Sequence, residues 1–128
     1  MTKLLFEEET YKIIGACMKV HASLGNGFLE SVYQEALEKQ FIKENIPFQR
    51  HEKLNVIFNH EKLKKYFVAD FVCYDKVVLE LKAVSFLRQD DERQLLNYLK
   101  ATSMEVGLLV NLGQKSLVWK RMINTKSV

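Results

Sequence analysis

The hydrophobic positions in the first third of the chain repeat with the period of an α-helix. Residues 7–24 open on three glutamates, where the N-terminal end of a helix favours negative charge. They continue with an apolar stripe at helical spacing, formed by Ile13, Ile14, Cys17, Val20 and Leu24. Gly25-Asn26-Gly27 predicts the end of this helix. A second helix is predicted over residues 28–45, with these side chains facing inward: Leu29, Val32, Tyr33, Ala36, Leu37 and Phe41.

The pattern changes to that of β-strands after Ile46-Pro47, since the residue before a proline avoids helical angles. Stretches rich in β-branched and aromatic residues predict strands over residues 54–58, 66–74, 77–83, 106–110 and 117–119. A helix over residues 89–101 interrupts them, with Leu95, Leu96 and Leu99 on its apolar side. The predicted order is α-α-β-β-β-α-β-β, an α/β fold in which helices flank a mixed sheet.

Composition adds that the chain is an ordinary globular protein. It has 128 residues, of which 48% are hydrophobic and 27% charged, which predicts a single domain over residues 1–128. It contains no apolar run of the roughly 18 residues that a membrane span needs. Cys17 and Cys73 lie among apolar residues. We expect them to be buried thiols of a cytoplasmic protein that makes no contact with a membrane.

Charge is unevenly distributed along the chain. Residues 1–45 carry five Lys and Arg against seven Asp and Glu, whereas residues 46–128 carry fourteen against nine. Lys62, Lys64 and Lys65 lie close together in the basic part. Such a cluster can bind phosphates, but at this density of charge a solvated surface is the simpler interpretation.

Charged residues interrupt two of the predicted strands. Asp70 lies within an otherwise apolar strand, and Glu80 shares one face of the next strand with Lys82. The simplest alternative is an exposed strand face in water. If the two strands form a hairpin, Asp70 lies beside Glu80 only when the loop has an odd number of residues. A three-residue loop over 74–76 pairs them directly, and a two-residue loop does not.

Three further polar residues on the predicted helices are candidates for the same site as Asp70, Glu80 and Lys82. Glu30 lies at the edge of the apolar side of the second helix, and Gln94 and Tyr98 are four residues apart on one face of the third helix. Taken alone, Glu30 is equally compatible with a residue at the helix edge that reaches solvent, and for Gln94 and Tyr98 a polar helix surface is the simpler interpretation. Carboxylate oxygens are the ligands that Mg²⁺ prefers. A bound divalent ion can activate water against a phosphodiester, and a lysine beside it can orient that water, help to deprotonate it or stabilise the transition state.

Taken in order, Asp70, Glu80-Leu81-Lys82 and the segment from Gln94 to Tyr98 resemble the active-site signature of the PD-(D/E)XK nuclease superfamily. The segment from Gly27 to Tyr33 is similar to the motif that gives the GxxExxY proteins their name. Ala69 stands where the superfamily name has proline, a position that supplies no chemistry. The resemblance covers nearly the whole chain.

The resemblance implies a restriction-endonuclease-like fold with a mixed central sheet. It implies that Asp70 and Glu80 are metal ligands, joined by the backbone carbonyl of Leu81 and by Glu30, and that the cofactor is Mg²⁺ or Mn²⁺. It gives Lys82 the place of the catalytic lysine, with Gln94 and Tyr98 completing the cleft.

The expected function is hydrolysis of phosphodiester bonds in nucleic acid, with DNA favoured over RNA. The expected contacts to the nucleic-acid backbone are Lys62, Lys64, Lys65 and Arg88. Two alternatives stay open. One is a module that binds nucleic acid without cutting it. The other is an interaction protein with a partner in a repair or defence assembly. A homo-oligomer also stays open, since the sequence does not fix the oligomeric state.

Two other candidate sites are weaker. Cys17 and His21 share a helix face and could bind a metal with His51 or His60, but no Cys-x-x-Cys pair supports that site. The Gly25-Asn26-Gly27 segment precedes a helix and could hold a phosphate. A plain turn between two helices is the simpler interpretation of that segment.

Overall fold

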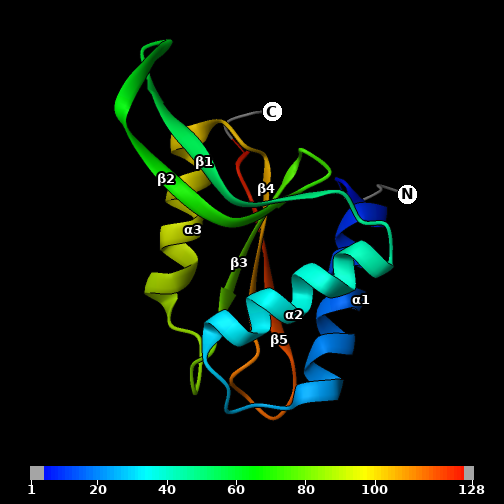
Figure 1. The fold of residues 1–128 in the computed structure, drawn as a ribbon. Helices are drawn as coiled ribbons and strands as arrows, with labels where there is room; N and C mark the ends of the chain where they lie inside the picture. Colours follow the sequence, from blue (N-terminus) through cyan, green and yellow to red (C-terminus); the bar gives the residue numbers. More distant parts are fainter. Residues whose placement is uncertain (1–4, 126–128) are drawn as a thin grey trace, which may run out of the picture.

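The chain folds into a five-stranded sheet with helices on both faces (Figure 1). The computed structural model describes residues 5–125. Its elements follow the predicted order, and their bounds are α1 Glu7–Leu24, α2 Glu30–Lys43, β1 Phe48–Phe58, β2 Glu61–Cys73, β3 Val77–Lys82, α3 Gln89–Thr102, β4 Val106–Asn111 and β5 Val118–Ile123. The predicted α/β fold with a mixed sheet is confirmed.

The strands lie in the sheet in chain order, β1-β2-β3-β4-β5. β3 and β4 are parallel and every other neighbouring pair is antiparallel. A parallel pair needs a crossover connection, which α3 provides on the face opposite α1 and α2 (Figure 1). Side chains of β3 and β4 alternate between the two faces, so each face has a core of its own.

The larger core lies between the sheet and the pair α1 and α2. Tyr33, Leu37 and Phe41 of α2 are spaced four residues apart and are almost fully buried there. Cys17 and Cys73 are free thiols within this core, as predicted. The smaller core joins α3 to the other face of the sheet through Leu95 and Leu99.

Two residues predicted to face inward on the second helix do not. Leu29 is 75% exposed and Val32 is 38% exposed. The helix begins at Glu30, so Leu29 is its N-cap and has extended backbone angles. Val32 precedes Tyr33 by one residue, about 100° around a helix, which turns it away from the buried stripe.

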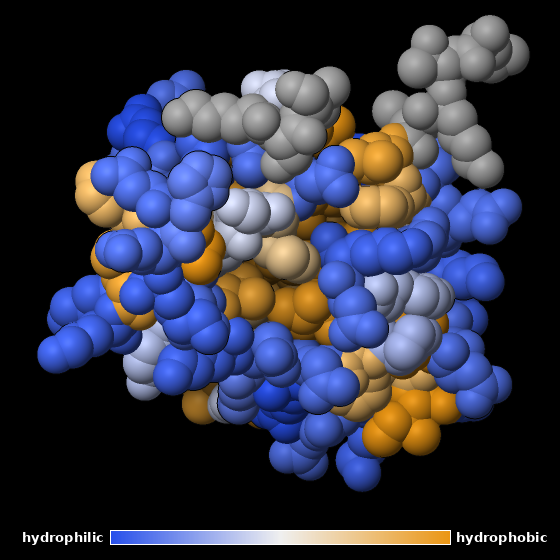
Figure 2. Space-filling model, turned by 90° about the horizontal axis from the view of Figure 1, so that it is seen from above, coloured by the Kyte–Doolittle hydropathy of each residue, from blue (hydrophilic) through white to orange (hydrophobic). Residues whose placement is uncertain are grey.

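β1 and β2 are longer than predicted. β1 begins at Phe48 instead of residue 54, and β2 begins at Glu61 instead of residue 66. Together they form a hairpin that projects from the body of the molecule (Figure 1). Residues 61–66 are all exposed. Seen from above, the surface on the side of this hairpin is mostly hydrophilic, whereas apolar side chains are exposed in a hollow nearer the middle (Figure 2). No helix within residues 5–125 has the length and apolar character needed to cross a membrane.

Candidate active site

The turn between β2 and β3 sets the register of the acidic residues. Residues 74–76 connect the strands, and the first two of them take left-handed backbone angles. Phe71 pairs with Leu79, so the next pair outward is Asp70 and Glu80. The loop therefore has the odd length that places these two carboxylates side by side.

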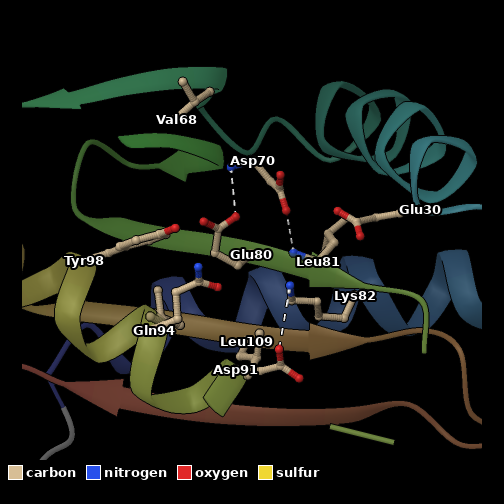
Figure 3. A pocket seen from close by; sticks show the side chains of 11 residues that line it. Glu30, Val68, Asp70, Glu80, Leu81, Lys82, Asp91, Gln94, Tyr98 and Leu109 are labelled. Carbon is tan, nitrogen blue, oxygen red and sulfur yellow. Dashed lines mark hydrogen bonds and ion pairs between the residues drawn. The ribbon is translucent and has the colours of Figure 1, made fainter. Parts of the chain in front are cut away.

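Asp70 and Glu80 are held by a reciprocal pair of hydrogen bonds (Figure 3). The backbone N–H of Asp70 donates to Oε2 of Glu80 at 3.1 Å. The backbone N–H of Leu81 donates to Oδ2 of Asp70 at 2.7 Å. The paired register of β2 and β3 ends at Phe71. The two side chains thus satisfy backbone groups at the point where the strands separate, and this fixes both carboxylates.

β2 changes direction at Asp70. Phe71 packs in the core against α1 and α2, whereas Ala69 packs in the core against α3. Strict alternation would place both side chains on one face. On the neighbouring strand, His51 lies opposite Asp70 and has a φ of 54°, which marks the bend. The bend lets β2 leave β3 and opens the sheet beside Glu80.

A pocket of about 170 Å³ lies at this opening. Five elements contribute to it: the start of α2, the bend in β2, the end of β3, one side of α3 and the middle of β4 (Figure 3). The lining residues are Glu30, Val68, Asp70, Glu80, Leu81, Lys82, Asp91, Gln94, Leu95, Tyr98 and Leu109. Six of the residues singled out in the sequence are therefore brought together here.

Lys82 is the single basic residue of this lining. Its Nζ lies 3.9 Å from Oδ1 of Asp91, which is on the first turn of α3. The Lys82 side chain is 30% exposed, so its charge is open to the pocket. Four carboxylates and one ammonium surround a small volume, an excess of negative charge that suits a bound cation.

The segment that follows Lys82 is anchored to the end of β4. Asn111 is fully buried, and its side chain exchanges two hydrogen bonds with the backbone of Val84, at 3.0 and 2.9 Å. Gly113 lies so close that a Cβ at this position would be 2.4 Å from backbone atoms of Val84. Only a residue without a side chain fits, and the close approach fixes the chain beyond Lys82.

Comparison with known proteins agrees with this geometry. A family model described as the PD-(D/E)XK nuclease superfamily matches residues 7–122. The chain belongs to the PD-(D/E)XK nuclease superfamily. The narrower resemblance to the GxxExxY proteins stays a prediction.

One solved structure with the same fold is the crystal structure of SSO0001. It is 19% identical and superposes with a TM-score of 0.59 over 92% of this chain. The match covers 59% of the SSO0001 chain, so the present chain spans about three fifths of its length. At this identity the likeness concerns the fold alone. A comparison with curated protein sequences gives no significant match.

The electrostatic surroundings of Asp70 and Glu80 favour a bound cation. Burial and then the charge of Asp70 raise the pKa of Glu80 to about 9. Burial and Asp70 also raise the pKa of Glu30, which Lys82 lowers in part. A cation between these groups would favour their ionised forms, because opposite charge offsets both causes of the shift.

The donor set fits a hard divalent ion. Asp70 and Glu80 supply carboxylate oxygens, and Mg²⁺ is usually bound by one or two carboxylates with waters completing its octahedron. Within residues 5–125, His, Cys, Asp and Glu side chains form no ready-made group of three around one point. The geometry therefore offers a two-carboxylate site, with Glu30 as a third acidic residue at the edge of the pocket.

Gln94 and Tyr98 both line the pocket from α3, as the four-residue spacing predicts. Tyr98 stacks on Phe67 of β2, with ring centroids 3.8 Å apart. Burial and the charge of Glu80 raise the pKa of Tyr98, so its hydroxyl keeps its proton at neutral pH. Gln94 is exposed and faces the opening.

The expected basic contacts do not form one patch. Lys62, Lys64 and Lys65 are exposed on the projecting hairpin, and none of them lines the pocket. Arg88 is the N-cap residue of α3, at the end of that helix remote from the hairpin (Figure 1). The four expected contacts therefore lie at two separate positions, and their role in binding nucleic acid stays a prediction.

Sequence reasoning missed Asp91, which lines the pocket, and two residues linked to its lining by hydrogen bonds, Gln34 and His51. Asp91 could have been found, because it lies three residues before Gln94 and so shares its side of the helix. Gln34 is four residues after Glu30 and bonds to it, a spacing that was equally visible. His51 contacts Gln34 only because β1 bends there, and nothing in the sequence signals that bend.

The alternative metal site around Cys17 is not supported. His21 bonds through its ring Nε2 to the backbone carbonyl of Gln114, 2.8 Å away, while His51 bonds to Gln34. His60 is exposed in the turn of the hairpin. The segment from Gly25 to Gly27 is a turn between α1 and α2, and the helix after it begins with Glu30, whose charge disfavours a phosphate there.

Proposed function

We propose that this domain hydrolyses phosphodiester bonds in nucleic acid, DNA in preference to RNA, using a divalent metal ion. The meeting of Asp70, Glu80 and Lys82 in one pocket carries the proposal. Membership of a nuclease superfamily supports the reaction class. The preference for DNA rests on the resemblance of the motifs.

In this proposal Asp70, Glu80 and the backbone carbonyl of Leu81 hold Mg²⁺ or Mn²⁺, and Glu30 joins them from α2. Such an ion lowers the pKa of a water and offsets the negative charge of a phosphodiester. The reciprocal hydrogen bonds keep the Asp70 and Glu80 carboxylates in place before any ligand arrives. Little reorganisation is then needed on binding.

Lys82 supplies a positive charge to the same pocket. Asp91 keeps its ammonium near the opening. From there it can donate a hydrogen bond to the attacking water or to a phosphate oxygen whose charge grows in the transition state. The Gln94 amide and the Tyr98 hydroxyl, facing the same volume, would orient the phosphate or the water.

The basic residues would guide the nucleic acid across the pocket. Lys62, Lys64 and Lys65 would contact backbone phosphates at the hairpin, and Arg88 would contact them at the far end of α3. Each neutralised phosphate releases counterions, so binding should weaken steeply with rising salt.

The test is cleavage of single-stranded and duplex DNA and RNA in the presence of Mn²⁺ or Mg²⁺. We expect cleavage by the wild type and at least a 100-fold slower rate in Glu80→Gln and Lys82→Ala, because each removes a group that acts on the reacting phosphate. Glu35→Gln and Lys39→Ala, exposed residues on α2, are the matched controls and should keep full activity.

The outcomes separate the alternatives. Undiminished cleavage in both Glu80→Gln and Lys82→Ala would contradict the assignment of the pocket. Binding of nucleic acid that persists without metal and in Glu80→Gln, with no cleavage by any form, would instead indicate a module that binds without cutting.

A further inference from the structure

Gln34 is a buried polar residue that links α2 to the acidic pair. The residue is 8% exposed and lies among the buried residues of α2. The amide Nε2 donates to Oε1 of Glu30 at 3.3 Å and to Oδ1 of Asp70 at 3.2 Å. One NH₂ group thereby joins two carboxylates that come from different elements and that would otherwise repel each other.

His51 fixes which end of the amide faces the carboxylates. Its ring Nε2 lies 3.1 Å from Oε1 of Gln34, so the ring donates and the amide oxygen accepts. A reversed amide would put its oxygen against the oxygens of Glu30 and Asp70 and leave the ring N–H without an acceptor. The observed orientation satisfies all of these groups.

Glu30 depends on this link more than the other two acidic residues do. Asp70 and Glu80 are each bonded to backbone through the reciprocal pair. Among the described residues, the Gln34 amide is the one hydrogen-bond partner of the Glu30 side chain. Without it, the first residue of α2 has nothing to keep its carboxylate turned toward the pocket instead of toward water.

We propose that Gln34 is a positioning residue that holds Glu30 beside Asp70 as a joint ligand set for a divalent cation, with His51 fixing the orientation of its amide. This inference rests on the proposed function and assigns a role that the superfamily signature does not contain. Gln34 touches neither the reacting phosphate nor the cation, and acts only through the carboxylates.

The role predicts a specific effect on cation affinity. Groups that orient metal ligands typically change affinity by 10- to 100-fold when they are removed. We expect Gln34→Leu and Glu30→Gln each to weaken Mn²⁺ binding about 10-fold. Because one acts through the other, the double variant should also lose about 10-fold, far short of the roughly 100-fold that independent effects would give.

The experiment is a calorimetric titration of Mn²⁺ into the whole chain in four forms: the wild type, Gln34→Leu, Glu30→Gln and the double variant. Circular dichroism establishes that each form is folded. Gln40→Leu is the matched control, because Gln40 lies on the same helix and its amide bonds to Glu44, away from the pocket. A second probe avoids the core altogether. His51→Gly retains freedom at the left-handed position and should weaken Mn²⁺ binding about 3-fold by releasing the amide.

Cleavage kinetics give a readout that a purely structural role would not move. In Gln34→Leu the Mn²⁺ concentration for half-maximal rate should rise about 10-fold, while the rate at saturating Mn²⁺ stays within about 2-fold of wild type. Unchanged Mn²⁺ affinity in Gln34→Leu and His51→Gly would overturn the positioning role and leave the proposed function intact. Multiplicative losses in the double variant would also overturn it. A wild type that neither binds Mn²⁺ nor cleaves with it would overturn both proposals.

Discussion

Glu80→Gln should change how the stability of the metal-free protein depends on pH. Burial and the neighbouring Asp70 raise the pKa of Glu80 to about 9, against about 4.3 for an unfolded chain. The folded state therefore binds a proton that the unfolded state releases. Stability from this source is fully present below about pH 4 and is lost as pH rises through 9.

The size of the effect follows from linkage. One proton of difference between the two states changes the free energy of unfolding by about 1.4 kcal/mol per pH unit. Because Asp70 and Glu80 titrate as a pair, we expect a loss of about 1–3 kcal/mol between pH 6 and pH 8. Glutamine keeps an oxygen that can accept the hydrogen bond from the Asp70 backbone and carries no charge, so the variant should lack this part of the loss.

Urea unfolding in EDTA at pH 6, 7 and 8 measures this directly, followed by circular dichroism and by the single tryptophan, Trp119. Glu35→Gln, exposed on α2, is the matched control and should follow the wild type. Comparing variants at each pH removes the contribution of the three histidines. Parallel pH profiles for the wild type and Glu80→Gln would refute the conclusion that Glu80 is protonated in the metal-free fold.

Two further predictions test the backbone that positions the site: the loop between β2 and β3, and the close approach of Gly113 to Val84. Deleting Asp75 preserves the three-residue loop only if Val77 joins it, so Cys73 then pairs with Val78 and Asp70 lies opposite Leu81 instead of Glu80. Calorimetry should then detect no Mn²⁺ binding, and retained affinity would show that the register is not needed. Gly113→Ala brings a Cβ to 2.4 Å from the Val84 backbone and should lower the free energy of unfolding by about 1–3 kcal/mol, measured by urea unfolding, whereas an unchanged midpoint would contradict the close approach.

Much of the fold follows from local patterns in the sequence. The helical stripe of α1, the apolar segments of β3 and β4 and the order of elements were all predictable, because the residues that form them are buried on defined faces. The lengths of β1 and β2 were not. Their hairpin is exposed and rich in lysine, and backbone pairing holds it where side-chain burial gives no signal.

The acidic pair was predictable through the parity of one loop, since strand pairing leaves only two possible faces for Asp70. Its surroundings were not. The bend at His51 and Asp70 carries residues of β2 from one core to the other, and alternation along a strand cannot anticipate that. The Gln34 link depends on the same bend, and the separation of Arg88 from the hairpin lysines depends on the length of α3.

The central claim is that Asp70 and Glu80 form a divalent metal site, and its most direct test is a calorimetric titration of Mn²⁺ into the wild type and Glu80→Gln. The account predicts saturable binding by the wild type and by the Glu35→Gln control, and none by Glu80→Gln. Equal binding by the wild type and Glu80→Gln, or no Mn²⁺ binding by the wild type with or without an oligonucleotide present, would contradict it.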